Sequence, residues 1–188
     1  MIELYKRVDS PVRYKVKPFE IGGLVKVLSN KKTILSAKDV PLLFDFFKVV
    51  EKYCSDLNNE DSNRTSLGLQ ELIYIVNCFQ RYEVSVSDNF KKLLADKLIL
   101  FLNNNEDSKL KELDLYRLAC SALFYSSKYE ALMPLASRLI HLFVGRLKQK
   151  NATMDPAHQV RSMQFLATRC RNMGLHLDQS VYSELRAY

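Results

Sequence analysis

Two stretches of the sequence, residues 73–99 and residues 115–140, repeat each other about 41 residues apart, a period typical of paired-helix repeats. Matching residues lie 42 positions apart in the first part of the two stretches and 41 positions apart in the second part. The matched pairs are Ile73/Leu115, Tyr74/Tyr116, Val76/Leu118, Cys78/Cys120, Leu94/Leu135, Ala95/Ala136, Leu98/Leu139 and Ile99/Ile140. Repeats of this kind predict a solenoid, in which each helix pair buries its apolar face against the next pair.

The remainder of the 188-residue chain also favours helix, because only five glycines and five prolines interrupt it. We therefore expect an all-α protein, a short α-solenoid of about three to four antiparallel helix pairs. Its helical-repeat domain covers residues 19–188 and follows an extended basic N-terminal arm at residues 1–18. Within the domain, we expect clear repeats at about 66–105 and 108–150 and degenerate repeats at about 19–54 and 155–188.

Proline, aspartate and glycine mark three of the expected helix ends. Pro134 either kinks the predicted helix 129–149 or lies in its true first turn, because proline lacks the N–H that a helix interior needs. Asp155 is placed to cap a further helix, with Pro156 at its first position and Gly174 at its end. These signals define the second helix of the second clear repeat and the first helix of the last repeat.

Positive charge gathers at the two ends of the chain. Residues 1–32 and residues 138–188 each hold eight basic residues (Lys or Arg) and three acidic residues (Asp or Glu). Residues 33–137, by contrast, hold 12 basic and 15 acidic residues. With a net charge of +7, this distribution favours a polyanionic partner, most often nucleic acid, over the alternative of an ordinary lysine excess. The candidate RNA-binding residues are Arg13, Lys15, Lys17, Arg138, Arg146, Lys148, Lys150, Arg161 and Arg169. The last two are eight residues apart and so lie roughly on one helix face.

Catalytic and cofactor motifs are missing, since the sequence has no GxGxxG, P-loop, HExxH or GxSxG pattern. We therefore expect neither an enzyme nor a cofactor. The four cysteines lack the paired spacing of a zinc site, so we expect no metal and four buried, reduced thiols at Cys54, Cys78, Cys120 and Cys170. No apolar run reaches the roughly 18 residues that a transmembrane helix needs, so no membrane span is expected.

Two motifs carry a resemblance to a known family. The first helix of the clear repeat reads Leu72-x-x-Ile75-x-x-Cys78-Phe79. The second helix reads Phe90-x-x-Leu93-Leu94-Ala95-x-x-Leu98, and Leu132-x-x-Leu135-Ala136-x-x-Leu139 repeats it. Over about residues 66–188, the chain resembles the heptatricopeptide and octotricopeptide repeats of organellar RNA-binding proteins, including the repeats that precede RAP domains.

The resemblance implies a non-catalytic, RNA-binding structural component of a mitochondrial ribonucleoprotein in the matrix, most concretely a lineage-specific subunit of the mitochondrial ribosome. Its partners would be ribosomal or other structured RNA and the neighbouring proteins of a large complex. The chain departs from the family in having no tryptophan, and hence no Pro-Pro-x-x-Trp signature. A period of about 41 residues also fits HEAT repeats. The alternative is therefore a HEAT-like protein-binding adaptor or an accessory subunit of another organellar complex.

Overall fold

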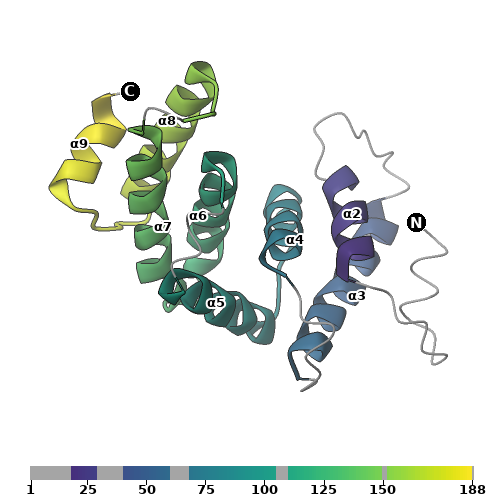
Figure 1. Cartoon of the computed structure of the whole chain (residues 1–188). Helices are drawn as coiled ribbons and strands as arrows, with labels where there is room; N and C mark the ends of the chain where they lie inside the picture. The colour runs from purple at the N-terminus through teal and green to yellow at the C-terminus, as the bar shows by residue number, and fades with distance from the viewer. Residues whose placement is uncertain (1–17, 29–39, 60–67, 105–109, 150–151, 188) are drawn as a thin grey trace, which may run out of the picture. The chain divides into compact units, whose positions relative to one another are not determined.

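The computed structural model describes residues 18–28, 40–59, 68–104, 110–149 and 152–187. These residues form eight helices and no strand, which confirms the expected all-α class for them. The helices, labelled as in Figure 1, are α2 (Pro18–Leu28), α3 (Val40–Asn59), α4 (Leu69–Arg81), α5 (Asp88–Asn103), α6 (Glu112–Ser126), α7 (Leu132–Leu147), α8 (Pro156–Asn172) and α9 (Gln179–Ala187). Apart from Pro18, the expected basic arm lies outside the described residues.

The chain divides into two compact units, residues 1–94 and residues 95–188, and the division falls inside α5. The first unit contains α2, α3, α4 and the beginning of α5. The second contains the end of α5 and the helices α6 to α9. The division therefore lies within the first clear repeat and not between two repeats.

In the first unit, α2 packs on α4 through one apolar face. Ile21, Val25 and Leu28 recur at helical spacing, and each is at most 1% exposed. Gly22 lies where α2 approaches α4, because a Cβ atom built there would come within 3.0 Å of Cγ of Glu71. A larger residue at this position would require the Glu71 side chain to shift, so glycine is suited to it despite its low helix propensity.

A row of aromatic rings joins α3, α4 and α5 in the first unit. The ring centroid of Phe79 lies 5.1 Å from that of Phe47 on α3 and 5.5 Å from that of Phe90 on α5. All three side chains are at most 1% exposed. Tyr82 also lies against Phe47, at 5.6 Å, and its hydroxyl donates a hydrogen bond to the carbonyl oxygen of Leu28 at 3.2 Å. The aromatic core thus also fixes the end of α2.

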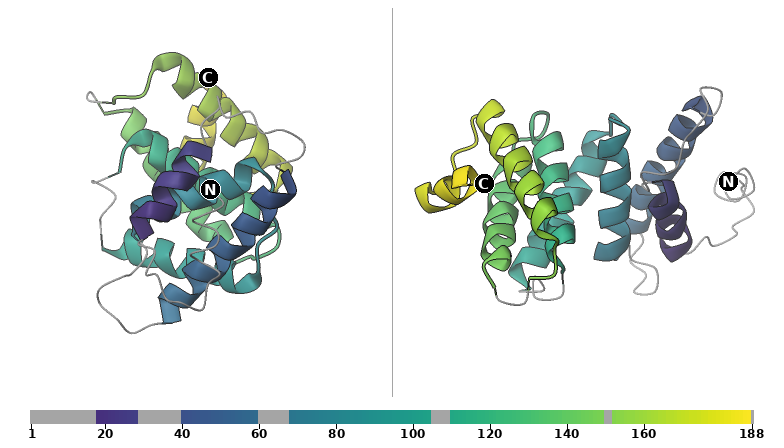
Figure 2. Two further views of the ribbon diagram at one scale, coloured as in Figure 1. Left: turned by 90° about the vertical axis from the view of Figure 1, so that its right-hand side faces the viewer. Right: turned by 90° about the horizontal axis from the view of Figure 1, so that it is seen from above.

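In the second unit, α6 packs against α7 and α8 packs against α9, and α6 also contacts α8 while α7 also contacts α9 (Figures 1 and 2). The connections within the two pairs are short, at residues 127–131 and residues 173–178. Side chains from all four helices fill the core between them, among them the buried Leu115, Leu118, Leu139, Phe143, Leu166 and Leu185. Each pair therefore buries the apolar face that its partner pair leaves open.

The helix ends of the second unit agree with the signals in the sequence. Pro134 is the third residue of α7, so it lies in the first turn and not at a kink. The carboxylate of Asp155 accepts a hydrogen bond from the backbone N–H of His158 at 3.1 Å, and Pro156 is the first residue of α8. Gly174 follows this helix with φ of +61°, in the left-handed region that favours glycine. All three expected boundaries are confirmed.

Burial follows the sequence repeat in the first helix of each copy but not throughout the second. The first-helix pairs Ile73/Leu115, Val76/Leu118 and Cys78/Cys120 are all at most 5% exposed. In the second helix, by contrast, Ile99 is 44% exposed whereas its counterpart Ile140 is fully buried. The two copies thus share one packing pattern but differ in what covers the end of their second helix.

All four cysteines are buried and unpaired, as expected for core thiols. Burial raises the pKa of Cys54, Cys78 and Cys120 to about 12 and the pKa of Cys170 to about 11. The neutral thiol is therefore the stable form of each at physiological pH, and such thiols are unreactive. Among the described residues, no group of three or more His, Cys, Asp or Glu side chains could hold a metal ion.

Candidate nucleic-acid interface

Five of the nine candidate RNA-binding residues fall in the described part of the chain. Arg138, Arg146 and Lys148 lie on or directly after α7, and Arg161 and Arg169 lie on α8. The other four, Arg13, Lys15, Lys17 and Lys150, lie outside the described residues. The described five belong to the second unit, where most of them have contacts within the protein.

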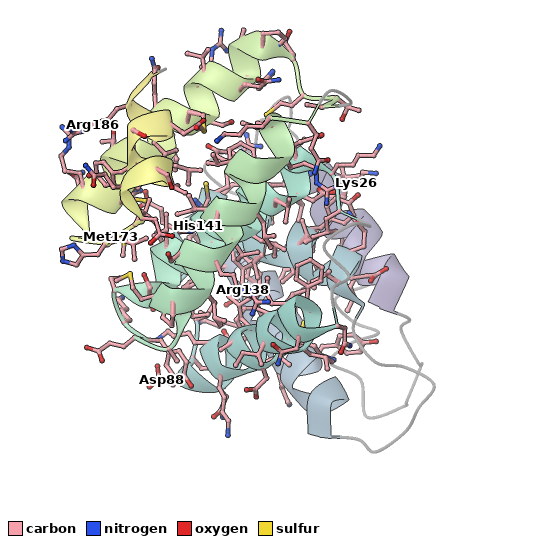
Figure 3. The ribbon with its side chains drawn as sticks, turned by 60° about the vertical axis from the view of Figure 1, so that its left-hand side comes forward. Lys26, Asp88, Arg138, His141, Met173 and Arg186 are labelled. Carbon is pink, nitrogen blue, oxygen red and sulfur yellow. The ribbon has the colours of Figure 1, made fainter. Side chains whose placement is uncertain are left out.

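Arg138 reaches the end of α5. Its guanidinium Nη2 donates a hydrogen bond to the carbonyl oxygen of Leu102 at 2.9 Å, and Figure 3 shows Arg138 on α7. The last carbonyl groups of a helix lack partners within it and carry a partial negative charge, so a cation there is stabilising. Part of the hydrogen-bonding capacity of Arg138 is therefore used within the fold, although the side chain remains exposed.

Arg146 lies near a buried carboxylate, that of Glu112 at the start of α6. Glu112 is 5% exposed, and its Oε2 accepts a hydrogen bond from the Thr153 hydroxyl at 2.8 Å, while Oε1 accepts one from the Thr153 N–H at 3.2 Å. Burial alone would raise the pKa of Glu112. The two hydrogen bonds from Thr153, a third from the backbone of Glu112 itself and the positive charge of Arg146 together outweigh this effect and lower the pKa. This arrangement fastens the segment before α8 to α6.

Two polar contacts join α7 and the residue after it to α9 and the residue before it. They involve Lys148 and His141. Lys148 forms an ion pair with Glu184 of α9. His141, labelled in Figure 3, lies 2.8 Å from the Ser137 carbonyl oxygen through Nδ1 and 2.8 Å from Oδ2 of Asp178 through Nε2. Both of these partners are acceptors, so both bonds form when the ring carries two protons. The basic residues of α7 thus serve mainly to hold neighbouring segments in place.

The exposed face of α8 is different. Arg161, Phe165 and Arg169 follow each other at intervals of four residues, so their side chains form one stripe along the helix. All three are exposed, Phe165 by 38%, and the guanidinium of Arg169 lies 5.6 Å from the centroid of the Phe165 ring. Arg161 forms no ion pair with any residue that the structure describes. We call these three residues the α8 stripe.

No acidic residue opposes the charge of the α8 stripe from within its own helix. The sequence of α8 contains three arginines and one histidine but neither Asp nor Glu. The third arginine, Arg171, is also exposed, but it is two residues beyond Arg169 and therefore projects from another side of the helix. An anion that approaches this face meets cations without a neighbouring carboxylate on the same helix.

Tyr116 of α6 holds the aromatic ring of the α8 stripe from beneath. Its ring centroid lies 6.3 Å from that of Phe165, in an edge-on arrangement, and 5.7 Å from that of the buried Phe143. Its hydroxyl is hydrogen-bonded to the Ser162 hydroxyl and to the Cys120 thiol. Phe165 is therefore fixed on one side by packing while part of its surface faces solvent.

The sequence points to the two arginines of the α8 stripe but not to the phenylalanine between them. By repeat position Phe165 aligns with Arg117, and the tyrosines are the more obvious candidates for stacking. Of these, Tyr125 is 3% exposed and belongs to the core, and Tyr74 lies under the Lys26 ammonium at 5.2 Å. The spacing Arg-x-x-x-Phe-x-x-x-Arg on a helix without acids is the signal that could have identified the stripe.

A small hollow lies at the turn between α8 and α9, with a volume of about 220 Å³. It is lined by Cys170, Arg171, Gly174, Leu175, His176, Leu177 and Tyr182. The thiol beneath it has a raised pKa and is therefore a poor nucleophile. Cys170 is thus not an activated thiol in this hollow.

No family model matches the chain, and neither a curated protein nor a solved structure matches it. The resemblance to organellar helical-repeat proteins therefore stays a prediction. Within the described ranges, no helix is both long and apolar enough to cross a lipid bilayer.

Proposed function

We propose that this protein is a non-catalytic, RNA-binding helical-repeat protein, and that it contacts RNA phosphates through α8. The observation that carries the proposal is the exposed α8 stripe, in which Arg161 and Arg169 lie on one face of a helix without acidic residues. Such a face attracts the phosphate backbone by charge, independently of base sequence. The α7 cations contribute less, because Arg138 and Lys148 already bind groups of the protein.

The repeat architecture is part of the same proposal. In a solenoid of helix pairs, the first helices of successive pairs stack on each other, and so do the second helices. The contacts of α6 with α8 and of α7 with α9 support this arrangement for the last two pairs. We extend it to about three to four pairs, with α4 and α5 as another clear pair and α2 and α3 as a degenerate one.

A place in a mitochondrial ribonucleoprotein, most concretely as a ribosomal subunit of the matrix, follows from the resemblance and is proposed on that ground. Residues Arg13, Lys15 and Lys17 would add phosphate contacts from the N-terminal arm. Replacing all three by glutamine should then reduce the fraction of the protein that sediments with ribosomes in a mitochondrial lysate. Unchanged sedimentation of the triple variant would count against a role for the arm.

Filter binding to a structured RNA across a salt series tests the RNA-binding proposal directly. The double variant R161Q/R169Q should bind more weakly at every salt concentration. Its plot of log affinity against log salt should be shallower by about 1.4 to 1.8, since each lost phosphate contact removes about 0.7 to 0.9. Arg171→Gln is the control for position, because it removes one positive charge from another side of the same helix. Wild-type affinity that is absent or insensitive to salt contradicts the proposal.

A protein-binding adaptor is the second candidate, and one observation favours it. Ile99 and Leu100 on α5 are 44% and 56% exposed, which places two large apolar side chains next to each other on the surface. Adjacent exposed apolar residues suit a protein partner better than RNA. Loss of a co-purifying protein from the double variant I99S/L100S, together with unchanged RNA binding, would support this function in addition to the first.

A further inference from the structure

We infer that the α8 stripe takes single-stranded RNA, with one unpaired base stacked on Phe165 and flanking phosphates bound by Arg161 and Arg169. This inference rests on the proposed function and makes it more specific. It concerns the state of the RNA strand, which charge alone does not determine.

The spacing of the stripe matches a short length of strand. Arg161 and Arg169 are eight residues apart, so their attachment points lie about 12 Å apart along the helix axis. Nucleotides in a stacked strand follow each other at about 3.4 Å, so this distance spans about three to four of them. A strand lying along α8 can therefore reach both guanidinium groups while a base between them meets the ring of Phe165.

The ring itself is available and held in place. Phe165 is 38% exposed, although large aromatic side chains are usually buried in a helical core. Tyr116 packs against it at 6.3 Å and is in turn anchored by Phe143 and by hydrogen bonds to Ser162 and Cys120. A ring that is already ordered loses little conformational entropy when a base stacks on it.

Arg169 already shows that the ring accepts a flat, electron-poor partner. Its planar guanidinium lies 5.6 Å from the Phe165 centroid, the distance of a cation–π contact. A base can take this place on the ring, which frees the guanidinium to bind a phosphate, or it can stack on the guanidinium plane. Either arrangement uses the ring and the cation together, and the second is not open to a lysine at this position.

Base pairing removes the partner that Phe165 requires. In an RNA duplex, each base is stacked between its neighbours, and the deep, narrow major groove keeps side chains from reading it. A duplex can then meet only the two arginines of the stripe, whereas a single strand meets the arginines and the ring. Single-stranded RNA should therefore bind more tightly than a duplex of the same length.

Fluorescence anisotropy with two labelled probes tests the inference, namely an oligouridine of about ten nucleotides and an RNA duplex of the same length. Phe165→Leu keeps an apolar side chain but removes stacking, and we expect it to weaken oligouridine binding on the order of 5- to 150-fold while leaving the duplex unaffected. Phe165→Tyr should retain wild-type affinity. Phe44→Leu is the matched control, because Phe44 is equally exposed, at 38%, but lies on α3 beside Asp45.

The outcomes separate this inference from the proposed function. Preference for oligouridine that is lost in Phe165→Leu and kept in Phe165→Tyr supports stacking. Stacking is overturned if the wild type binds both probes equally and Phe165→Leu binds them as tightly as the wild type. RNA binding itself still stands in that case if R161Q/R169Q binds more weakly. Binding of neither probe overturns both. If Phe165→Leu unfolds at the assay temperature, Phe165→Met replaces it, since methionine keeps a large apolar side chain but has no ring to stack, and unchanged oligouridine affinity then counts against the inference.

Discussion

Replacing Glu112 by glutamine tests how a single buried carboxylate holds the segment that leads into α8. Glu112 is the first residue of α6, and Thr153 lies in the connection between α7 and α8, far along the chain. Glutamine keeps the length of the side chain and one acceptor oxygen but removes the negative charge. The change therefore isolates the charge from the packing.

The magnitude follows from the two hydrogen bonds. A hydrogen bond to a charged group contributes about 1.5 to 3 kcal/mol and a neutral one about 0.5 to 1.5 kcal/mol. In the variant, one of the two hydrogen bonds from Thr153 is kept, but its acceptor is now a neutral amide oxygen. The other Thr153 donor faces the amide N–H₂ group, which cannot accept, and binds water instead, because Thr153 is exposed. Together these two changes would cost about 2.5 to 4.5 kcal/mol, and the smaller cost of burying a neutral amide in place of a carboxylate offsets part of this. We expect the free energy of unfolding to fall by about 1 to 2 kcal/mol at pH 7.

The loss should depend on pH in a direction that the pKa of Glu112 determines. This pKa is lower in the folded protein than in the unfolded chain, because the hydrogen bonds and Arg146 outweigh the opposing effect of burial. The carboxylate therefore stabilises the fold above its unfolded pKa of about 4.3. That stability disappears as the pH falls through the lower, folded value. The difference between wild type and E112Q should shrink over this acidic range.

Urea unfolding followed by far-ultraviolet circular dichroism, at neutral pH and at a series of acidic pH values, measures this difference. Glu130→Gln is the matched control, because Glu130 is an exposed glutamate of the same unit and should change stability by less than about 0.5 kcal/mol. The reasoning is refuted if E112Q is as stable as E130Q at neutral pH. It is also refuted if the gap to wild type stays constant as the pH falls.

Two further substitutions test the packing and the backbone. Phe79→Ala should destabilise the first unit by about 3 to 5 kcal/mol, because it removes a fully buried ring between Phe47 and Phe90. A loss below about 1 kcal/mol in urea unfolding would contradict this. Gly174→Ala should cost about 1 to 2 kcal/mol through its φ of +61° alone, since nothing lies within 4 Å of the added Cβ. At Gly145, inside α7, nothing lies within 4 Å of an added Cβ either, and Gly145→Ala should raise the free energy of unfolding by up to about 1 kcal/mol. Equal effects of Gly174→Ala and Gly145→Ala would rule out a left-handed backbone conformation at residue 174.

The helices are well predicted from the sequence because their ends carry local signals. Asp155, Pro156 and Gly174 act within one or two turns of themselves, so the expected ends of α8 agree with the observed ones to within a residue or two. Pro134 is compatible with two outcomes, and its position in the first turn of α7 becomes clear only from the hydrogen-bonded helix. Local chemistry thus defines both ends of α8, whereas a proline alone does not define where α7 begins.

The candidate site is harder to predict because its contacts are distant in sequence. Glu112 resembles an ordinary partner for a helix dipole, since its true partner Thr153 lies 41 residues further along the chain, in the connection before α8. Lys148 resembles a free cation in the sequence, whereas the structure places Glu184 of α9 beside it. Phe165 resembles a core residue by type, and only its exposure of 38% distinguishes it from one.

The short α9 helix has a consequence for how the chain opens. Its nine residues are fewer than the about 12 to 15 that an isolated helix needs, so it is helical only while docked. It packs on α8 and α7 through the buried Val181 and Leu185. Lys148, directly after α7, pairs with Glu184 of α9, and His141 of α7 contacts Asp178 just before it. Detaching it costs less than unfolding the unit, which gives the chain a partially open state of its own. In that state the core beneath α9 meets solvent while the helices before it stay folded.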